Sequence, residues 1–291
     1  MNRRSLLSVA SFAAALILAY LGAEIWLTRK LDERVEALAH QLPPSVTLNI
    51  GDSSVRLFGY EARVSDLVLS GPAGRIRIDA IAFDHFDFGH DVPQYASGTV
   101  HGLAIDAGEV APEGRALLAS LGYQKVVLDV AFDYRFEPEK SLFMLNNLRI
   151  SGPRVGRLAV SGEIANVATL APETPLATFA LMLRAALNKA TLRYEDDGLV
   201  ERIQTREAKR AGIAVADYRA QLARNIDDAM AKTADDRPRE AMARLKAFVE
   251  HPRQLTVTAM PREPVPLFRV ASARNPATAL RLLDVTVING P

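Results

Sequence analysis

The residues best suited to metal chemistry lie in one short segment, Asp84–Asp91, which contains His85, Asp87 and His90. Side chains two residues apart on a strand share a face, so His85 and Asp87 would lie together and a turn could bring His90 near. Imidazole and carboxylate groups at such separations are ligands that transition metals accept. Turns also collect Asp, His and Gly for conformational reasons alone. That interpretation is the simpler one, and no metal site is predicted.

A second acidic group, Tyr194–Asp197 with Glu201, offers paired carboxylates of the kind that acid–base catalysis or calcium binding would use. The simpler interpretation is a turn, because Asp-Asp-Gly precedes a predicted helix whose N-terminus favours negative charge. The sequence contains no glycine-rich phosphate loop, nucleophile elbow or His-Glu-x-x-His motif. We therefore predict no catalytic residue, no cofactor and a non-enzymatic protein.

Composition narrows the possible partners further. The chain of 291 residues carries a formal net charge of +1, which argues against nucleic acid as a partner. It has no cysteine, so disulfides, thiolate catalysis and cysteine-based metal sites are excluded.

The N-terminal segment 6–27 is an apolar run that includes Leu6, Leu16, Leu21 and Trp26. About 20 helical residues cross a hydrocarbon core, and an indole ring suits the headgroup level, so a transmembrane helix is predicted here. The alternative is a cleaved secretory signal. Its apolar part would be shorter, and Leu21 occupies a position where a cleavage site needs a small residue.

The flanks of this predicted span suggest its orientation. Residues 1–5 form a short tail with the basic pair Arg3-Arg4, and such tails usually remain in the cytoplasm. Residues 28–44 have helical periodicity that ends at Pro43-Pro44, and we interpret them as a stalk. The expected location is therefore a bacterial inner membrane, crossed once, with the C-terminal domain in the periplasm.

Residues 45–195 have the two-residue period of strands. The clearest example runs from Val126 to Glu137, where apolar residues alternate with mainly polar ones. Turn sequences separate the other candidates, and little helix is expected between them, so an antiparallel sheet is predicted. The other candidate strands are Val46–Ile50, Ser54–Phe58, Ala62–Leu69, Arg75–Phe88, Gly98–Asp106, Leu142–Ile150, Arg157–Ala165 and Thr178–Leu187.

This region also repeats itself. The stretch Leu67–Ile78 matches Leu148–Val160 with one residue inserted, which indicates a sheet built from similar hairpins. A shorter signature recurs more often: apolar, any residue, small or polar, apolar, any residue, apolar. It occurs at Val64–Leu69, Val100–Ile105, Leu145–Ile150, Leu187–Leu192 and Leu282–Val287.

Residues 196–291 change character again. Helical periodicity predicts a helix from Leu199 to Gly212, another carrying Tyr218 to Met230 on one stripe, and a third from Arg239 to Glu250. Their other faces are densely charged. Strands are predicted around Leu255–Ala259 and Val285–Ile288, so this region supplies a helical insertion and closing strands packed on the sheet.

The predicted anchor, the recurring signature in Val64–Leu69 and the closing strands together resemble the AsmA-like group. The stretch Ala190–Leu199, which runs into charged helices, is also similar to uncharacterised membrane-anchored proteins of Gram-negative bacteria. The resemblance to the AsmA-like group implies a single-pass envelope protein whose β-rich domain is associated with lipid transport and outer-membrane assembly.

Two predicted strands are apolar on both faces and must be covered on both sides. Strict alternation in Ala62–Leu69 would direct Val64 and Val68 to one face and Leu67 and Leu69 to the other. In Thr178–Leu187 it would place Phe179, Leu181 and Leu183 on one face. The cover could be the protein's own helices, a second sheet, a protein partner or an acyl chain.

These observations predict an α+β protein with an N-terminal transmembrane helix, a curved antiparallel β-sheet domain and a C-terminal helical insertion. The expected function is envelope lipid handling or assembly, with Val64, Val68, Phe179, Leu181 and Leu183 as candidates for an acyl-chain groove. The expected partners are the lipid bilayer and a lipid ligand or an envelope protein. The alternative is an interaction scaffold that docks another membrane protein through a sheet edge or the charged helices.

Overall fold

The computed structural model describes residues 45–56, 61–87, 89–90, 92–169, 180–181, 183–273 and 275–290. The predicted tail, transmembrane span and stalk, with Leu6, Leu16, Leu21 and Trp26, lie outside these residues. Within the described part of the chain, no helix combines the length and apolarity needed to cross a bilayer.

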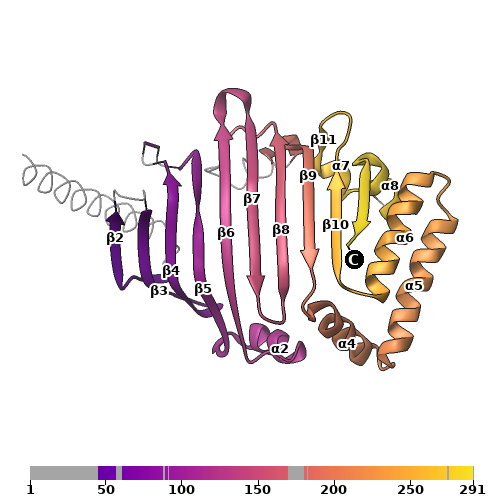
Figure 1. Cartoon of the computed structure of the whole chain (residues 1–291), viewed down its shortest axis with the longest axis horizontal. Helices are drawn as coiled ribbons and strands as arrows, with labels where there is room; N and C mark the ends of the chain where they lie inside the picture. The colour runs from indigo at the N-terminus through magenta and orange to yellow at the C-terminus, as the bar shows by residue number, and fades with distance from the viewer. Residues whose placement is uncertain are drawn as a thin grey trace, which may run out of the picture.

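A single 12-stranded sheet dominates the fold, and every strand pair in it is antiparallel (Figure 1). The strand order is β1-β3-β4-β5-β6-β7-β8-β9-β10-β12, with β2 paired to β3 and β11 paired to β9. The strands are β1 (Thr47–Asn49), β2 (Asp52–Arg56), β3 (Glu61–Gly71), β4 (Gly74–Phe86), β5 (Tyr95–Val110), β6 (Lys125–Glu137), β7 (Leu142–Gly152), β8 (Gly156–Ala165), β9 (Ala186–Glu195), β10 (Gln254–Ala259), β11 (Val265–Pro266) and β12 (Val285–Asn289).

The longer sequence repeat corresponds to two equivalent hairpins, β3–β4 and β7–β8. Each hairpin has a glycine with positive φ at the start of its second strand: Gly74 at 115° and Gly156 at 102°. A Cβ on Gly74 would lie 2.4 Å from Glu109 O, and one on Gly156 would lie 2.1 Å from Glu195 O. Both glycines therefore permit close contact with the neighbouring backbone, which explains why the repeat conserves this turn sequence within the chain.

The shorter signature marks places where strand alternation is interrupted. Its third residue has positive φ at Asp66 (54°), Gly102 (63°) and Asp284 (45°). On β5, two residues between Val100 and Leu103 lie opposite one residue of β6, which is a β-bulge. Comparable register shifts occur at the signatures of β7 and β9. The signature thus marks a bulge on β5, β7 and β9, and a residue with positive φ on β3 and directly before β12.

The described helices are gathered at one flank and one end of the sheet (Figure 1). They are α2 (Pro112–Ser120), α4 (Leu199–Ala211), α5 (Val215–Ala231), α6 (Asp236–Glu250), α7 (Leu267–Ala271) and α8 (Pro276–Leu282), with a 3-10 turn at Pro138–Lys140. The sequence analysis did not predict α2. The strand predicted at Thr178–Leu187 is wrong: Leu181 and Leu183 are helical, and β9 begins only at Ala186.

Two buried clusters lie at opposite flanks of the sheet. At the C-terminal flank, Ala241 and Phe248 of α6 pack on Leu255, Val285 and Val287. At the N-terminal flank, Ala62, Val64 and Leu67 of β3 form the second cluster, with Ile78, Ile81 and Phe83 of β4 packed against them. The strands between these clusters have far fewer buried apolar side chains.

Candidate functional site

A continuous apolar surface on β5–β8 is the candidate functional site. Cross-strand pairing places its residues on one face, because directly paired residues point the same way: Ile105 pairs with Val126, and Val130 pairs with both Val100 and Ile150. Each of its side chains is only partly buried. We call it the open face, and its residues are Val100, Leu103, Ile105, Val126, Leu128, Val130, Phe132, Leu145, Leu148, Ile150, Leu158 and Val160.

The open face continues into both buried clusters, and on the N-terminal side Val100 pairs with Ile81, which packs against the β3 cluster. Val160 pairs with Leu192, which pairs with Val257 beneath the α6 cluster. Across this short distance exposure changes sharply: Leu192 is 36% exposed, whereas Val287 is 5% exposed. Among the described elements, no helix makes an extended contact with β6, β7 or β8. The described helices therefore pack on β10 and β12, α2 contacts β5, and β6–β8 are left without a helix packed on them.

Aromatic side chains gather at one end of the open face. The rings of Phe83 and Phe132 meet edge-on with centroids 6.1 Å apart, and Tyr134 stacks on Phe143 at 5.8 Å. The Tyr134 hydroxyl donates to Pro93 O at 3.1 Å. Burial, followed by the negative charge of Asp87, raises the pKa of Tyr134, so the phenol stays neutral at physiological pH. The rings at this end therefore present apolar surface, and the Tyr134 hydroxyl among them already has a hydrogen-bond partner.

The opposite face of the same strands is charged. Lys189 pairs with Glu163 at 2.6 Å, and Arg157 pairs with Glu195 at 2.9 Å. Val127, between open-face residues Val126 and Leu128, points to this charged side and is 39% exposed. One face of the sheet is therefore charged and the other is apolar, and only the apolar open face suits an apolar ligand.

The candidate metal ligands His85, Asp87 and His90 do not form one site. Asp87 is buried and accepts from Gly89 N at 2.9 Å, from Gln94 N at 2.9 Å and from His90 Nδ1 at 2.7 Å. His85 is exposed and contacts Ser97 Oγ at 3.2 Å. Asp87 lies one residue beyond the end of β4, and its carboxyl group contacts His90, whereas the described contact of the His85 ring is with Ser97. The described residues contain no group of three or more acidic or histidine ligands suited to a metal.

The carboxyl group of Asp87 instead holds its loop together. Burial raises its pKa, but hydrogen bonds from Gln94, Gly89 and His90 outweigh this effect, so the pKa lies below its ordinary value. This arrangement agrees with the simpler sequence interpretation, in which the segment is a turn.

The second acidic group is also structural. Asp196 accepts from Gly198 N at 2.9 Å and Val200 N at 3.0 Å, and so bonds backbone groups at the start of α4. The Tyr194 hydroxyl lies 2.9 Å from Asp196 Oδ1 and 2.7 Å from Val155 O. Burial, reinforced by the hydrogen bond to Asp196, raises the pKa of Tyr194. These contacts fasten the β7–β8 turn to α4.

The predicted groove residues lie in different places. Val64 is 2% exposed within the β3 cluster, and Leu67 packs beside it on the same face. Val68 pairs with Arg77 on the charged side, so the predicted shared face of Val64 and Val68 is wrong. The cause is Asp66, whose positive φ interrupts the alternation.

Neither Leu181 nor Leu183 belongs to a strand of the open face. Leu181 and Leu183 belong to a helical turn, and Phe179 lies outside the described residues. The open face itself was missed as a site, although the apolar positions of Val126–Phe136 were recognised. Alternation of apolar and polar residues alone predicts an ordinary buried face at these positions.

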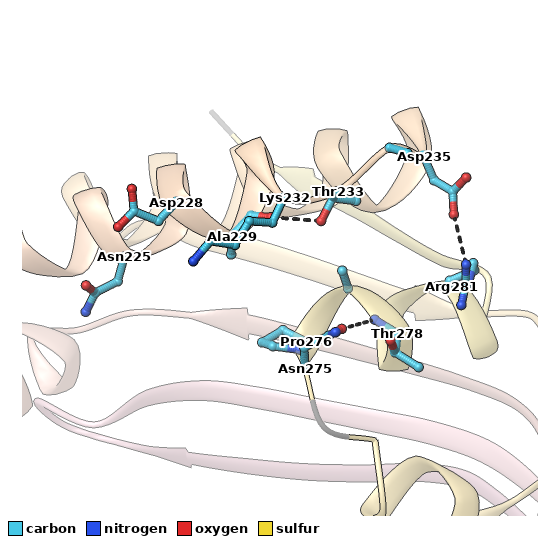
Figure 2. Close-up of a pocket in the computed structure, with 12 residues that line it drawn as sticks. Asn225, Asp228, Ala229, Lys232, Thr233, Asp235, Asn275, Pro276, Thr278 and Arg281 are labelled. Atoms are coloured by element: carbon cyan, nitrogen blue, oxygen red, sulfur yellow. Dashed lines mark hydrogen bonds and ion pairs between the residues drawn. The ribbon is translucent and has the colours of Figure 1, made fainter.

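A separate cavity of about 610 Å³ lies between α5, the start of α6, and α8 (Figure 2). Its wall mixes the acids Asp228 and Asp235 with the cations Lys232 and Arg281, and Arg281 Nη1 lies 3.5 Å from Asp235 Oδ2. Asn275 Oδ1 accepts from Thr278 N at 2.8 Å, which caps α8. A wall of mixed charge does not suit an acyl chain, and the Arg281–Asp235 ion pair links α8 to the residue before α6.

Comparison with known proteins adds one match. A protein-family model described as "Uncharacterized protein" matches residues 149–290, which run from β7 to β12 and include α4, α5, α6, α7 and α8. No curated protein matches the chain with significant similarity.

Proposed function

We propose that this protein is a non-enzymatic, membrane-anchored lipid-handling or envelope-assembly factor of the bacterial inner membrane. Its C-terminal domain would lie in the periplasm, and the open face of β5–β8 would contact acyl chains. The observation that carries the proposal is the open face itself, an apolar surface continuous with two buried clusters, on which strands β6–β8 make no extended contact with any described helix.

The chemistry of this surface supports an acyl chain. A contiguous exposed apolar patch marks a place where a protein binds another apolar surface. The side chains of the open face are all aliphatic or aromatic, so a hydrocarbon chain would leave no polar group unpaired. Each methylene group transferred from water to such a surface contributes about 0.8 kcal/mol.

The predicted N-terminal anchor supports a membrane location. The first described strand, β1, begins at Thr47, directly after the predicted stalk. A membrane helix joined by a short stalk would keep the sheet close to the bilayer, where lipid is concentrated. The proposal of an inner-membrane, periplasm-facing protein therefore rests on the sequence patterns at residues 1–44.

Matched substitutions on β6 provide a direct test. Val130→Asp introduces a charge in the middle of the open face, whereas Val127→Asp introduces the same charge on the opposite face of the same strand. Full-length protein in detergent would be mixed with phospholipid carrying a fluorescent acyl chain. We expect wild type and Val127→Asp to bind it and Val130→Asp to lose at least about tenfold in affinity, since a charge on an apolar contact opposes burial.

Circular dichroism would show that both variants retain the sheet. Equal lipid binding by Val130→Asp and Val127→Asp, or absence of binding by the wild type, would contradict the proposal.

A further inference from the structure

Two arginines from distant parts of the chain meet at the ring of Tyr123, just before β6. Arg154 lies in the β7–β8 turn, with its Cζ 5.6 Å from the ring centroid. Arg202 lies in α4, with its Cζ 4.9 Å from the same centroid. Both distances fall within the range of a cation–π contact. The Tyr123 side chain is buried, so this ring is a fixed platform for two positive charges.

Most donors of these guanidinium groups are not used within the described structure. Arg202 Nη1 donates to Leu121 O at 3.0 Å. Within the described part of the chain, neither guanidinium has a carboxylate oxygen within the 4.0 Å that defines an ion pair. A guanidinium has five N–H donors, so several remain for a ligand. Arg154 is exposed and Arg202 is partly exposed, which leaves both accessible.

The nearby acids are already engaged. Asp197 Oδ2 accepts from the backbone N of Arg154 at 2.6 Å. Asp196 accepts from backbone groups of Gly198 and Val200 and lies by the Tyr194 hydroxyl. These acids order the turn and the helix start, and they leave the guanidinium groups without a charged partner of their own.

Gly122 shapes the approach of Arg202. It has φ of +72°, and a Cβ at this position would lie 2.9 Å from Arg202 Nη1. A side chain here would be strained and would displace the guanidinium. The chain therefore places a residue without a side chain where the cation needs room.

This cluster lies at the end of the sheet where α2 and α4 are found (Figure 1). Val126 of the open face is next to the first residue of β6, and Ile150 and Leu158 are the open-face residues that flank the β7–β8 turn. An elongated amphiphile lying along β6 would thus have one end near Arg154.

We propose that Arg154 and Arg202 form a binding site for a phosphate group. Arginine binds phosphate oxygens through paired N–H donors, and a dianion or monoanion between two guanidinium groups removes their mutual repulsion. The phosphate belongs either to a lipid headgroup, in which case the site extends the proposed acyl-binding function, or to a free phosphate compound.

The test uses full-length protein in neutral detergent and three probes: inorganic phosphate, dihexanoyl phosphatidic acid and dihexanoyl phosphatidylcholine. Binding would be measured by isothermal titration for wild type, Arg154→Gln, Arg202→Gln and the double variant. Arg157→Gln is the matched control, since Arg157 follows the same turn and is exposed but already pairs with Glu195. We expect each single substitution to weaken phosphatidic acid binding about tenfold, which corresponds to roughly 1.4 kcal/mol.

The double variant should lose binding of phosphatidic acid to the level of phosphatidylcholine, while Arg157→Gln should match wild type. If inorganic phosphate shows the same arginine dependence and phosphatidic acid adds no affinity, the site serves a free phosphate compound. Unchanged anion binding by the double variant, or an equal loss with Arg157→Gln, would overturn the inference. Failure of the phosphate site can be distinguished from failure of the acyl-chain proposal, because neutral lipid binding and the Val130→Asp variant test the acyl-chain proposal alone.

Discussion

Val64 and Leu67 lie three positions apart on β3, yet they pack in the same buried cluster. Regular alternation would place them on opposite faces. Asp66, with φ of 54°, supplies the irregular residue that keeps both side chains on one face. Similar interruptions on β5, β7 and β9 preserve one apolar face across the sheet.

The conformation of Asp66 gives the first prediction. Asp66→Ala should lower the free energy of unfolding by about 1 kcal/mol, because alanine is disfavoured in the left-handed region. Asp66→Gly should have little effect, since glycine adopts this conformation readily. Urea unfolding of the full chain, followed by circular dichroism, measures both changes. If alanine and glycine had the same effect, the conformational explanation would fail.

The loop around Asp87 predicts a pH dependence. The pKa of Asp87 lies below its ordinary value of 3.8, so its hydrogen bonds add stability above that pH. This contribution should be lost as the pH falls through the lower folded-state pKa. Asp87→Asn should reduce stability at pH 7 and flatten the acid limb of the stability curve. Thermal unfolding between pH 2 and pH 7 checks this, and a parallel shift of the two curves would contradict it.

Tyr194 is expected to stabilise the junction between the β7–β8 turn and α4. Tyr194→Phe removes the hydroxyl beside Val155 O and Asp196 Oδ1, so we expect a loss of about 1–2 kcal/mol in unfolding free energy. Tyr95→Phe is the control, because Tyr95 is exposed and its hydroxyl has no such pair of acceptors among the described contacts. Denaturant unfolding of both variants provides the measurement. A loss no larger than that of the control would show that the junction does not depend on this hydroxyl.

The contrast between covered and open apolar surface predicts different costs for the same substitution. Phe248→Ala removes a buried ring beneath α6 and should cost about 3 kcal/mol. Phe132→Ala, on the open face, should cost about half as much because that ring is only partly buried. Addition of a lipid that binds the open face should stabilise wild type more than Phe132→Ala. Equal costs for the two substitutions would show that the open face is covered in solution.

Much of the architecture follows from local patterns. The strand from Val126 to Glu137 and the helix from Arg239 to Glu250 correspond to β6 and α6, because one has a clean two-residue period and the other an apolar stripe. The hairpin repeat was also visible, since both copies need glycine at the same turn position. The α+β class with a large antiparallel sheet is therefore confirmed.

The failures have physical causes. α2 was not predicted because its nine residues carry no clear apolar stripe. In the structure none of them is buried. The strand predicted at Thr178–Leu187 is apolar on both faces, a pattern that a short helix shares. The faces of β3 were predicted wrongly because Asp66, with its left-handed backbone conformation, interrupts the alternation of side chains between the two faces. The open face was missed because exposure depends on which helix covers which strand, and that is a property of the tertiary structure.

The connectivity from β3 to β9 has an evolutionary consequence, because each of these strands pairs with its neighbour in sequence. A hairpin duplicated at one of the turns would add two strands and widen the sheet by about 10 Å, at roughly 4.8 Å per strand. Only the pair of strands joined by that turn would have to separate, and the other pairs would keep their register. This topology allows the open face to become wider or narrower by one hairpin at a time. The two buried clusters at the flanks of the sheet would stay intact.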